Sequence, residues 1–393
     1  MRKLFSVIIF ISIILRILPG QAIPGRVKMF YSGHAYQGEE GRVYPYSLYD
    51  KLTGNVPAEV MRKIYNEIST PYKYGLVLPP PDDSKKADCP TVFRNKGNWY
   101  MTYIIFDGRG YETWLAKSRD LLNWETLGRI MAFSDTSRWD SNQAAGYPGL
   151  YDYEWGGSYR LEKYAGKYWL SYLGGRVTGY ESGLLSVGIA STGKNPGKAH
   201  GWQRLDKPVL MSTDKDVRWW ENDKLYKSTV IWDKSGSTGY KFVMFYNAHG
   251  DSIVPRTGAE RIGMAVSDDM VHWQRYMKDP VLNHHRGITG DPYIQKIDGI
   301  WLMFYFGAFW QPDQRIAFDN FACSYDLVNW TDWHGEKLIE PSEDYDDRYA
   351  HKPCVIKWKG VVYHFYCAVN KRDQRGIAVA SSVDLGRSEV SFK

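Results

Sequence analysis

Residues 350–356, Ala-His-Lys-Pro-Cys-Val-Ile, open the stretch from which the fold of this chain can be predicted. A turn at Lys359-Gly360 follows, then an aromatic run over 361–366 and a third apolar run over 376–380. Short runs rich in β-branched and aromatic residues, bounded by Gly, Asn, Asp and Lys, are typical of β-strands. The stretch therefore predicts one small sheet.

The same arrangement occurs four more times along the chain. The other copies begin at Asp88, Gly157, Tyr226 and Gly290, each with an aromatic second run. The first, third and fourth copies end with Ser, Asp and Trp at one spacing: Ser118, Asp120, Trp124; Ser267, Asp269, Trp273; and Ser324, Asp326, Trp330. A repeat of about 40–50 residues marks a β-propeller, in which radially stacked sheets bury each other's faces. We expect an all-β fold, a five-bladed β-propeller with a short N-terminal extension.

The N-terminus has the pattern of a signal peptide. Arg2 and Lys3 precede an apolar run over 4–15, and small residues lead to a plausible cleavage point after Ala22. The run is too short to span a membrane. Without Arg2, Lys3 and Arg16 the formal charge falls from +6 to +3, so nucleic-acid binding is not expected. We expect export to the periplasm or the extracellular space.

The remaining chain divides into an extension, residues 23–84, and a propeller, residues 85–393. The extension should contain a helix over 56–65 and a strand over 74–78, which would pair with the fifth blade and close the ring. Residues 135–153 read as a long surface loop. Cys89 and Cys354 lie in neighbouring inner strands; buried free thiols are expected, and a disulfide stays open. No cofactor or metal motif is present, although a single channel ion such as calcium stays open.

The chemistry is expected where the inner strands begin, because those starts converge on one mouth of a propeller's channel. The residues at these starts are Asp88, Cys89, Tyr226, Lys227, Gly290, Asp291, His351 and Lys352. Charges crowded into a partly dry site must be paired or used. Two carboxyl groups about 6.5–9.5 Å apart are the usual apparatus of inverting glycoside hydrolysis, and a histidine can also serve as the acid.

The blade starts Asp88-Cys89-Pro90, Gly290-Asp291-Pro292 and His351-Lys352-Pro353, together with the element Asp326-Leu327-Val328-Asn329-Trp330, resemble the five-bladed propeller glycosidases of glycoside hydrolase families 43 and 117. The resemblance covers residues 85–386. It implies a base Asp on the first blade, but Asp88 lies two residues before its proline. The acid Glu of family 43 has no counterpart at Tyr226-Lys227, and Ser158 stands where an Asp is expected. Asp88, Asp291 and His351 are more similar to the set of family 117.

We therefore expect an exported, exo-acting glycoside hydrolase that removes a terminal sugar from an oligosaccharide by inversion. Asp88 would be the base, His351 the acid, and Asp291 a residue that orients the sugar or tunes His351. The expected substrate-binding residues are Trp155, Arg160, Lys227, Arg286, Trp310 and Lys352. Glu154 or Glu221 is the alternative acid. A non-catalytic glycan-binding module and a phosphorylase-like transferase stay open, as do the sugar, the linkage, retention against inversion and the oligomeric state.

Overall fold

The computed structural model describes residues 36–37, 43–44, 55–251, 258–311, 313 and 315–393. The signal peptide predicted over residues 1–22 lies outside the described residues. Within residues 1–49 the structure describes one antiparallel pair, β1 (Tyr36–Gln37) and β2 (Val43–Tyr44). Residues 50–393 form a separate compact part. No helix in the described ranges is long and apolar enough to cross a membrane.

The compact part begins with helix α3 (Ala58–Ile68), close to the helix predicted over 56–65. Pro57 precedes its first residue, a place where the missing N–H of proline costs no helical hydrogen bond. Val60, Met61 and Ile64 form the buried face. Strand β3 (Tyr72–Leu78) follows the helix.

The described strands after β3 form five antiparallel repeats. The first consists of β4 (Lys86–Asn95), β5 (Asn98–Phe106), β6 (Tyr111–Ser118) and β7 (Trp124–Met131). The second consists of β8 (Gln143–Pro148), β9 (Tyr168–Gly175), β10 (Leu185–Thr192) and β11 (Gln203–Arg204). The third consists of β12 (Lys224–Trp232), β13 (Phe242–His249), β14 (Glu260–Ser267) and β15 (Gln274–Arg275). The fourth consists of β16 (Ile288–Ile297), β17 (Ile300–Ala308), β18 (Ala317–Ser324) and β19 (Trp330–Asp332).

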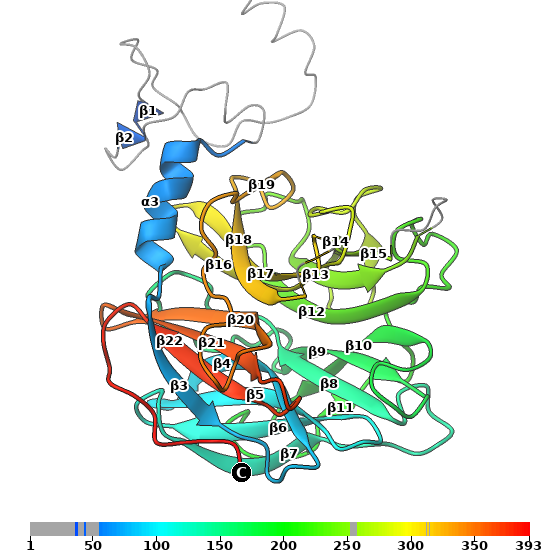
Figure 1. The fold of residues 1–393 in the computed structure, drawn as a ribbon. Coiled ribbons are helices and arrows are strands. Elements are labelled where there is room, and N and C mark those ends of the chain that lie inside the picture. The colour runs from blue at the N-terminus through cyan, green and yellow to red at the C-terminus, as the bar shows by residue number, and fades with distance from the viewer. Residues whose placement is uncertain (1–35, 38–42, 45–54, 252–257, 312, 314) are drawn as a thin grey trace, which may run out of the picture. The chain divides into compact units, whose positions relative to one another are not determined.

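The fifth repeat contains strands from both ends of the compact part. Its members are β20 (Tyr349–Trp358), β21 (Val361–Val369), β22 (Arg375–Ser381) and the N-terminal β3, which pairs antiparallel with β22. Figure 1 shows the blue β3 beside the red β22. This is the partner that the sequence predicts for the strand over 74–78.

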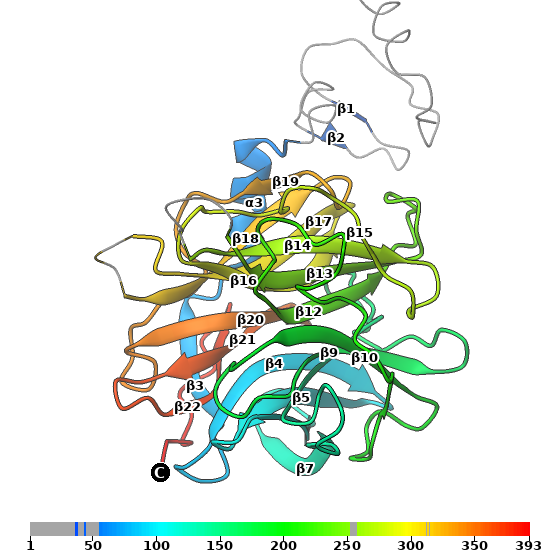
Figure 2. The same cartoon turned by 90° about the vertical axis from the view of Figure 1, so that its right-hand side faces the viewer.

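Most successive repeats contact one another through their first strands, while the first strand of the second repeat, β8, contacts β5 and β6 of the first. β8 contacts β12, β12 contacts β16, β16 contacts β20, and β20 contacts β4. In Figure 2 the repeats follow one another around the compact part, from cyan for the first to orange and red for the fifth. The start of every first strand is thereby brought toward the same region.

The second repeat differs from the prediction. Its first strand is β8, inside the segment 135–153 for which the sequence predicts a surface loop, and every residue of β8 is buried. Gly157, the predicted start, lies in the connection between β8 and β9. The sequence Gln-Ala-Ala-Gly-Tyr-Pro has few β-branched residues, so its propensity for a strand is weak; packing decides its conformation instead. A Cβ at Gly146 would come within 3.1 Å of the sulfur of Met131, so the small residues permit this close packing.

The repeated Ser, Asp and Trp make a turn that joins the third and fourth strands. In the fourth repeat, the Oγ of Ser324 accepts a hydrogen bond from the N–H of Asp326 (3.1 Å), and the indole N–H of Trp330 donates to the carbonyl of Leu327 (2.9 Å). The first and third repeats have the same bonds, at Ser118 and Ser267. This motif therefore has a structural role, because it satisfies backbone groups inside a tight turn.

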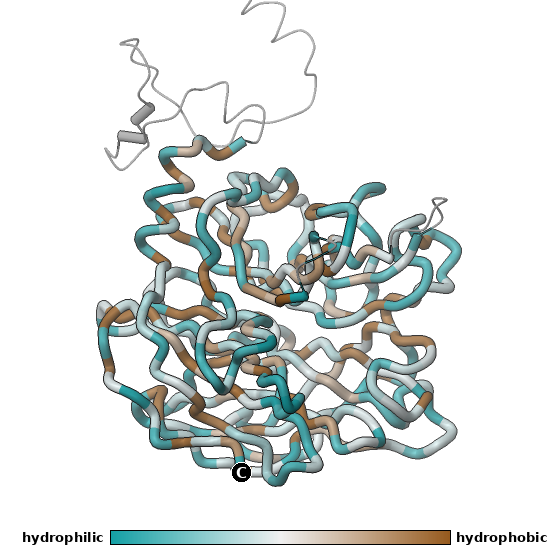
Figure 3. Tube along the Cα trace, in the orientation of Figure 1, coloured by the Kyte–Doolittle hydropathy of each residue, from teal (hydrophilic) through white to brown (hydrophobic). Residues whose placement is uncertain are grey.

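Apolar and aromatic side chains fill the space between neighbouring repeats. One buried cluster contains Trp169 and Val187 of the second repeat with Val230, Phe242 and Met244 of the third. Figure 3 shows apolar segments, in brown, recurring along the strands, while many of the connections are polar. Most of the aromatic second strands thus belong to the core.

Candidate active site

Four first strands begin with a register shift at equivalent places. The shifts lie between Asp88 and Thr91, Leu225 and Ser228, Gly290 and Tyr293, and His351 and Cys354. The residues directly before proline, Cys89, Asp291 and Lys352, have φ values of 49°, 54° and 66°. That conformation is uncommon for an L-residue before proline, and such a bulge re-aims the side chain. Asp88 is therefore the structural equivalent of Gly290 and His351, and Asp291 is the equivalent of Cys89.

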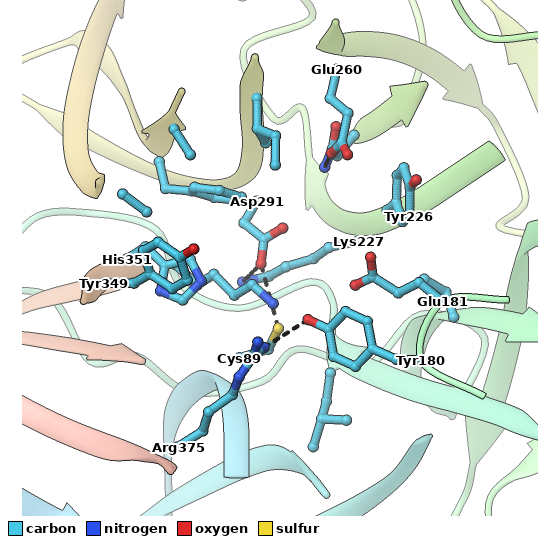
Figure 4. Close-up of a pocket in the computed structure, with 18 of the residues that line it drawn as sticks. Cys89, Tyr180, Glu181, Tyr226, Lys227, Glu260, Asp291, Tyr349, His351 and Arg375 are labelled. Carbon is cyan, nitrogen blue, oxygen red and sulfur yellow. Dashed lines mark hydrogen bonds and ion pairs between the residues drawn. The ribbon is translucent and has the colours of Figure 1, made fainter. Parts of the chain in front are cut away.

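These strand starts line one cavity of about 260 Å³. Four predicted residues, Lys227, Asp291, His351 and Lys352, are in its wall. The wall also contains Cys89, Tyr111, Tyr147, Tyr180, Glu181, Tyr226, Asn247, Glu260, Arg348, Tyr349 and Arg375. Figure 4 shows the carboxyl groups of Glu181, Glu260 and Asp291 in the same space. The convergence of strand starts predicted from the sequence is thus observed.

Two of these carboxyl groups, Glu181 and Glu260, are not predicted by the sequence. Glu181 lies in the connection between β9 and β10, and its Oε1 accepts a hydrogen bond from the hydroxyl of Tyr111 (3.1 Å). Glu260 is the first residue of β14, and its Oε2 accepts one from the amide of Asn247 (2.9 Å). The repeat pattern predicts no function at either place, and no local motif marks them.

The surroundings of both glutamates favour the protonated acid. Burial, reinforced by the negative charge of Glu181, raises the pKa of Glu260 to about 8. Burial also raises the pKa of Glu181, against the effects of Lys352 and the Tyr111 hydrogen bond. Two nearby carboxyl groups in a low-dielectric cavity cannot both ionise easily, so one of them holds a proton near neutral pH.

Asp88 lies behind the cavity and does not line it. Its Oδ2 is 2.7 Å from the Nζ of Lys352 and 3.6 Å from Nη1 of Arg375. Burial opposes the charged carboxylate, but the positive charges of Lys352 and Arg375 outweigh it and lower the pKa of Asp88 far below its usual value. This carboxylate is a poor proton acceptor, so its surroundings favour a role in charge pairing.

His351 lines the cavity as a neutral imidazole. Burial, with the nearby charge of Lys352, lowers the pKa of His351 to about 3. Its Nδ1 is 3.2 Å from the carbonyl oxygen of Cys367, which fits Nδ1–H as the donor. A neutral imidazole is a very weak acid, so these surroundings do not favour His351 as the general acid.

Three buried polar atoms of the wall have no hydrogen-bond partner among the described residues: the Nζ of Lys227, the Oδ1 of Asn247 and the Nε of Arg375. Lys227 is 3.7 Å from Oδ2 of Asp291, beyond hydrogen-bond length. That same oxygen is 3.4 Å from the thiol of Cys89, which donates to it. Unsatisfied donors and acceptors are costly in a buried wall. They are available to the hydroxyl groups of a ligand.

The other predicted substrate-binding residues lie outside this wall. The indole N–H of Trp155 donates to Glu67 of α3 (2.8 Å), and that of Trp310 donates to the carbonyl of Ile288 (2.7 Å). Trp310 also stacks on His284, with ring centroids 3.7 Å apart. Arg160 and Arg286 are exposed elsewhere. The two tryptophans therefore pack against neighbouring side chains instead of lining the cavity.

The alternative acids, Glu154 and Glu221, do not reach the cavity either. Glu221 is completely buried and accepts hydrogen bonds from Arg275 and the hydroxyl of Tyr246, both at 2.6 Å. Glu154 pairs by a backbone bridge with Lys296. Burial and these bonds give Glu221 a structural role, whereas Glu154 is exposed.

All four cysteines, Cys89, Cys323, Cys354 and Cys367, are buried free thiols. In the part of the chain that the structure describes, no group of three or more His, Cys, Asp or Glu side chains could hold a metal ion.

Comparison with known proteins gives close relatives. No family model matches the chain. It is 53% identical to the protein in a solved BT0996 complex with RGII, with a TM-score of 0.83 over 86% of this chain and 99% of that one. It is 52% identical to a solved glycoside hydrolase, with the same TM-score and the same coverage of both chains.

A curated relative is more distant. It is the 1,2-beta-oligomannan phosphorylase of Thermoanaerobacter sp. (strain X514), 35% identical over 148 residues, which are 35% of this chain and 46% of that protein. The match thus spans less than half of the relative's length.

The predicted resemblance to families 43 and 117 is seen in the fold. A thermostable family-43 glycoside hydrolase has a TM-score of 0.54, and the family 117 enzyme Zg3597 of Zobellia galactanivorans has one of 0.56, each at 16% identity. These two structures have propeller-type folds. With 52% identity over nearly the whole of a solved glycoside hydrolase, the chain belongs to the glycoside hydrolases, in the same family as that enzyme.

Proposed function

We propose that this protein is an exported, exo-acting glycoside hydrolase that removes a terminal sugar from an oligosaccharide with Glu181 and Glu260. The observation that carries the proposal is the pair of carboxyl groups in one small cavity, with raised pKa values. Glycoside hydrolysis requires one protonated and one ionised carboxyl group on the two sides of the scissile bond. A cavity of about 260 Å³ is small, which suits one terminal sugar better than an extended chain.

Glu260 is the general acid in this proposal. With a pKa raised to about 8 it is protonated at neutral pH and can protonate the departing glycosidic oxygen. Glu181, held by the hydroxyl of Tyr111, is the ionised partner that acts on water or on the anomeric carbon. Lys227, Asn247 and Asp291 bind hydroxyl groups of the sugar, which would satisfy the unpaired atoms of Lys227 and Asn247. Asp88 and His351 then support the site instead of transferring protons.

The experiment is sugar release from an oligosaccharide panel that includes fragments of RGII, which is named in the complex of the 53% identical relative. Wild type is compared with Glu181→Gln, Glu260→Gln, Asp88→Asn and His351→Gln. Loss of about a thousandfold or more in both Glu181→Gln and Glu260→Gln, with folding intact, supports the assignment. Activity retained by both would overturn it. NMR of the released sugar tests inversion, which stays a prediction.

Phosphorolysis is the second candidate, because the curated relative described above is a phosphorylase. The cations Lys227, Arg348, Lys352 and Arg375 in the cavity wall could attract phosphate. Turnover without phosphate, giving free sugar only, excludes it. Turnover that requires phosphate and yields a sugar phosphate would replace hydrolysis.

We also propose that the five repeats close into a five-bladed propeller and that residues 1–22 are removed on export. The contact of β20 with β4 and the pairing of β3 with β22 support closure. N-terminal sequencing of the secreted protein tests the cleavage after Ala22.

A further inference from the structure

We propose that Arg375 is a positioning residue, which acts through Tyr180 to hold the loop that carries Glu181 over the cavity. The proposal rests on the catalytic role assigned to Glu181 above. The loop, residues 176–184, connects β9 and β10 in the second repeat, whereas Arg375 begins β22 in the fifth. The contact therefore joins two repeats that are not neighbours along the chain.

The base of this loop is attached to the first two repeats. The amide of Gln143 donates to the carbonyl of Gly179 (2.8 Å), and the N–H of Gly179 donates to the carbonyl of Arg109 (2.8 Å). These bonds end one residue before Tyr180. They do not by themselves determine where the side chains of Tyr180 and Glu181 point.

Arg375 contacts the outer part of the loop, at Tyr180. Its Nη1 donates to the hydroxyl of Tyr180 (2.7 Å), and its guanidinium carbon is 5.0 Å from the centre of the ring. Figure 4 shows this bond beside the Glu181 side chain. The ring also meets Phe106 and Tyr111 edge-on, with centroids 5.4 and 5.7 Å away. Tyr180 is 39% exposed. The Nζ of Lys224 also donates to the carbonyl of Glu181 (3.0 Å), which holds the backbone of the loop but not the two side chains.

Arg375 can fix the position of Tyr180 because its own guanidinium is paired with two carboxylates. Its side chain is only 12% exposed and lies 3.6 Å from Asp88 and 3.5 Å from Asp373. A planar guanidinium has donors in several directions, so it can bind these anions and Tyr180 together. Asp88, which the sequence predicts to be the catalytic base, thus helps to hold the side chain of Arg375 in place.

Loss of the contact between Arg375 and Tyr180 should lower kcat. Glu181 follows Tyr180 directly, and its carboxyl group has one hydrogen bond, from Tyr111. A displacement of about 1 Å in a catalytic group can cost about a hundredfold in rate. Loss of the Arg375–Tyr180 contact should therefore displace the carboxyl group of Glu181, although Glu181 itself is unchanged.

The test is a double-mutant cycle of Tyr180→Phe and Arg375→Ala, measured as kcat and KM on one substrate. Tyr180→Phe keeps every charge and the ring, so it tests the link even if Arg375→Ala folds poorly. We expect each single variant to lose about 10- to 100-fold in kcat, with a smaller change in KM, and the double variant to be no worse than the poorer single variant. Guanidinium ions should partly restore Arg375→Ala. The matched control is Lys86→Ala, which also removes a cation paired with Asp373 but does not touch Tyr180; it should keep the wild-type kcat.

Wild-type kcat in Tyr180→Phe, or losses that multiply in the double variant, would overturn the proposal. A rise in KM alone would also overturn it, because Arg375 would then bind substrate directly. Glu181→Gln is measured beside these variants. If Glu181→Gln stays active, the proposed function itself fails. If Glu181→Gln is inactive while Tyr180→Phe has the wild-type kcat, only the positioning role of Arg375 fails.

Discussion

Asp88 is a buried carboxylate between two cations, and this determines what it can do. Lys352 and Arg375 both approach its Oδ2, and the pKa of Asp88 is lowered although burial alone would raise it. The pKa of Lys352 is raised for the same reason: burial opposes its charge, but Asp88 outweighs burial. Removing one member of such a buried pair leaves the other uncompensated.

Asp88→Asn should therefore cost about 3–5 kcal/mol in the free energy of unfolding at pH 7. The folded-state pKa of Asp88 is depressed, so its contribution is present above the unfolded pKa of about 3.9 and is lost as the pH falls below it. Urea unfolding of both proteins between pH 3 and 7 measures this, and the difference should shrink at the acid end. An inactive variant of wild-type stability would instead restore Asp88 as the catalytic base.

The alkaline limb of the pH profile belongs to Glu260. Since the acid must be protonated, kcat/KM should fall as the pH rises through about 8. It should also fall at low pH, as Glu181 gains a proton at a pKa raised above its ordinary value. Glu260→Gln should lose the alkaline limb and retain more activity on an aryl glycoside, whose leaving group needs no proton. A limb that stays in Glu260→Gln and disappears in His351→Gln would contradict this assignment.

Among the elements, the first strands determine what lines the cavity. Their register shifts direct Cys89, Lys227, Asp291 and Lys352 to the same place. The small residue Gly290, directly before Asp291, also affects the geometry of the cavity. A Cβ at Gly290 would lie 2.5 Å from the Nδ2 of Asn247, the atom that holds Glu260.

Gly290→Ala should therefore push Asn247 aside and lower kcat by about tenfold or more, since Glu260 loses its hydrogen bond. Because that bond favours the ionised carboxylate, its loss should move the alkaline limb to higher pH. The pH profile of kcat/KM measures the shift. The control is Gly193→Ala, directly after β10, where the backbone is not left-handed and no atom of a non-adjacent residue lies within 4 Å of the added Cβ; it should leave the limb in place. An unchanged limb in Gly290→Ala would mean that Asn247 does not hold Glu260.

At the scale of the whole molecule, β3 connects the beginning of the compact part to its end. It is the fourth strand of a repeat whose other strands lie about 300 residues later in the chain. Leu76 of β3 is buried in one cluster with Ala350, Tyr366 and Ala378. If the ring is closed, this packing stabilises every repeat, not only the fifth.

Leu76→Ala should cost about 2–5 kcal/mol by removing buried apolar contacts and leaving a cavity. Unfolding should remain one transition, with the intrinsic tryptophan fluorescence and the loss of activity sharing a midpoint. Two separated transitions, with the fifth repeat melting first, would contradict closure. Leu184→Ala, at an exposed side chain, gives the comparison for a leucine outside the core.

Much of the fold could be predicted because its signals are local. Strand runs, the proline found at three of the four bulges and the Ser, Asp and Trp turn depend on residues close together in the chain, and their repetition predicts the architecture. The start of the second repeat could not be placed correctly, because β8 has a weak strand propensity and is held by packing. The signal available was Tyr147-Pro148, the same residue-before-proline pattern as in the first strands of the first, fourth and fifth repeats.

The sequence by itself determined the all-β repeats, the turns and the meeting of Lys227, Asp291, His351 and Lys352 at one mouth. Only the tertiary structure decided which carboxyl groups lie together and what surrounds each of them. Glu181 and Glu260 are ordinary glutamates in sequence, one in a loop and one at a strand start, and become a pair by meeting across the cavity. Whether a carboxyl group is an acid, a base or a counter-ion depends on its burial and on the charges around it, and those neighbours come from distant parts of the chain.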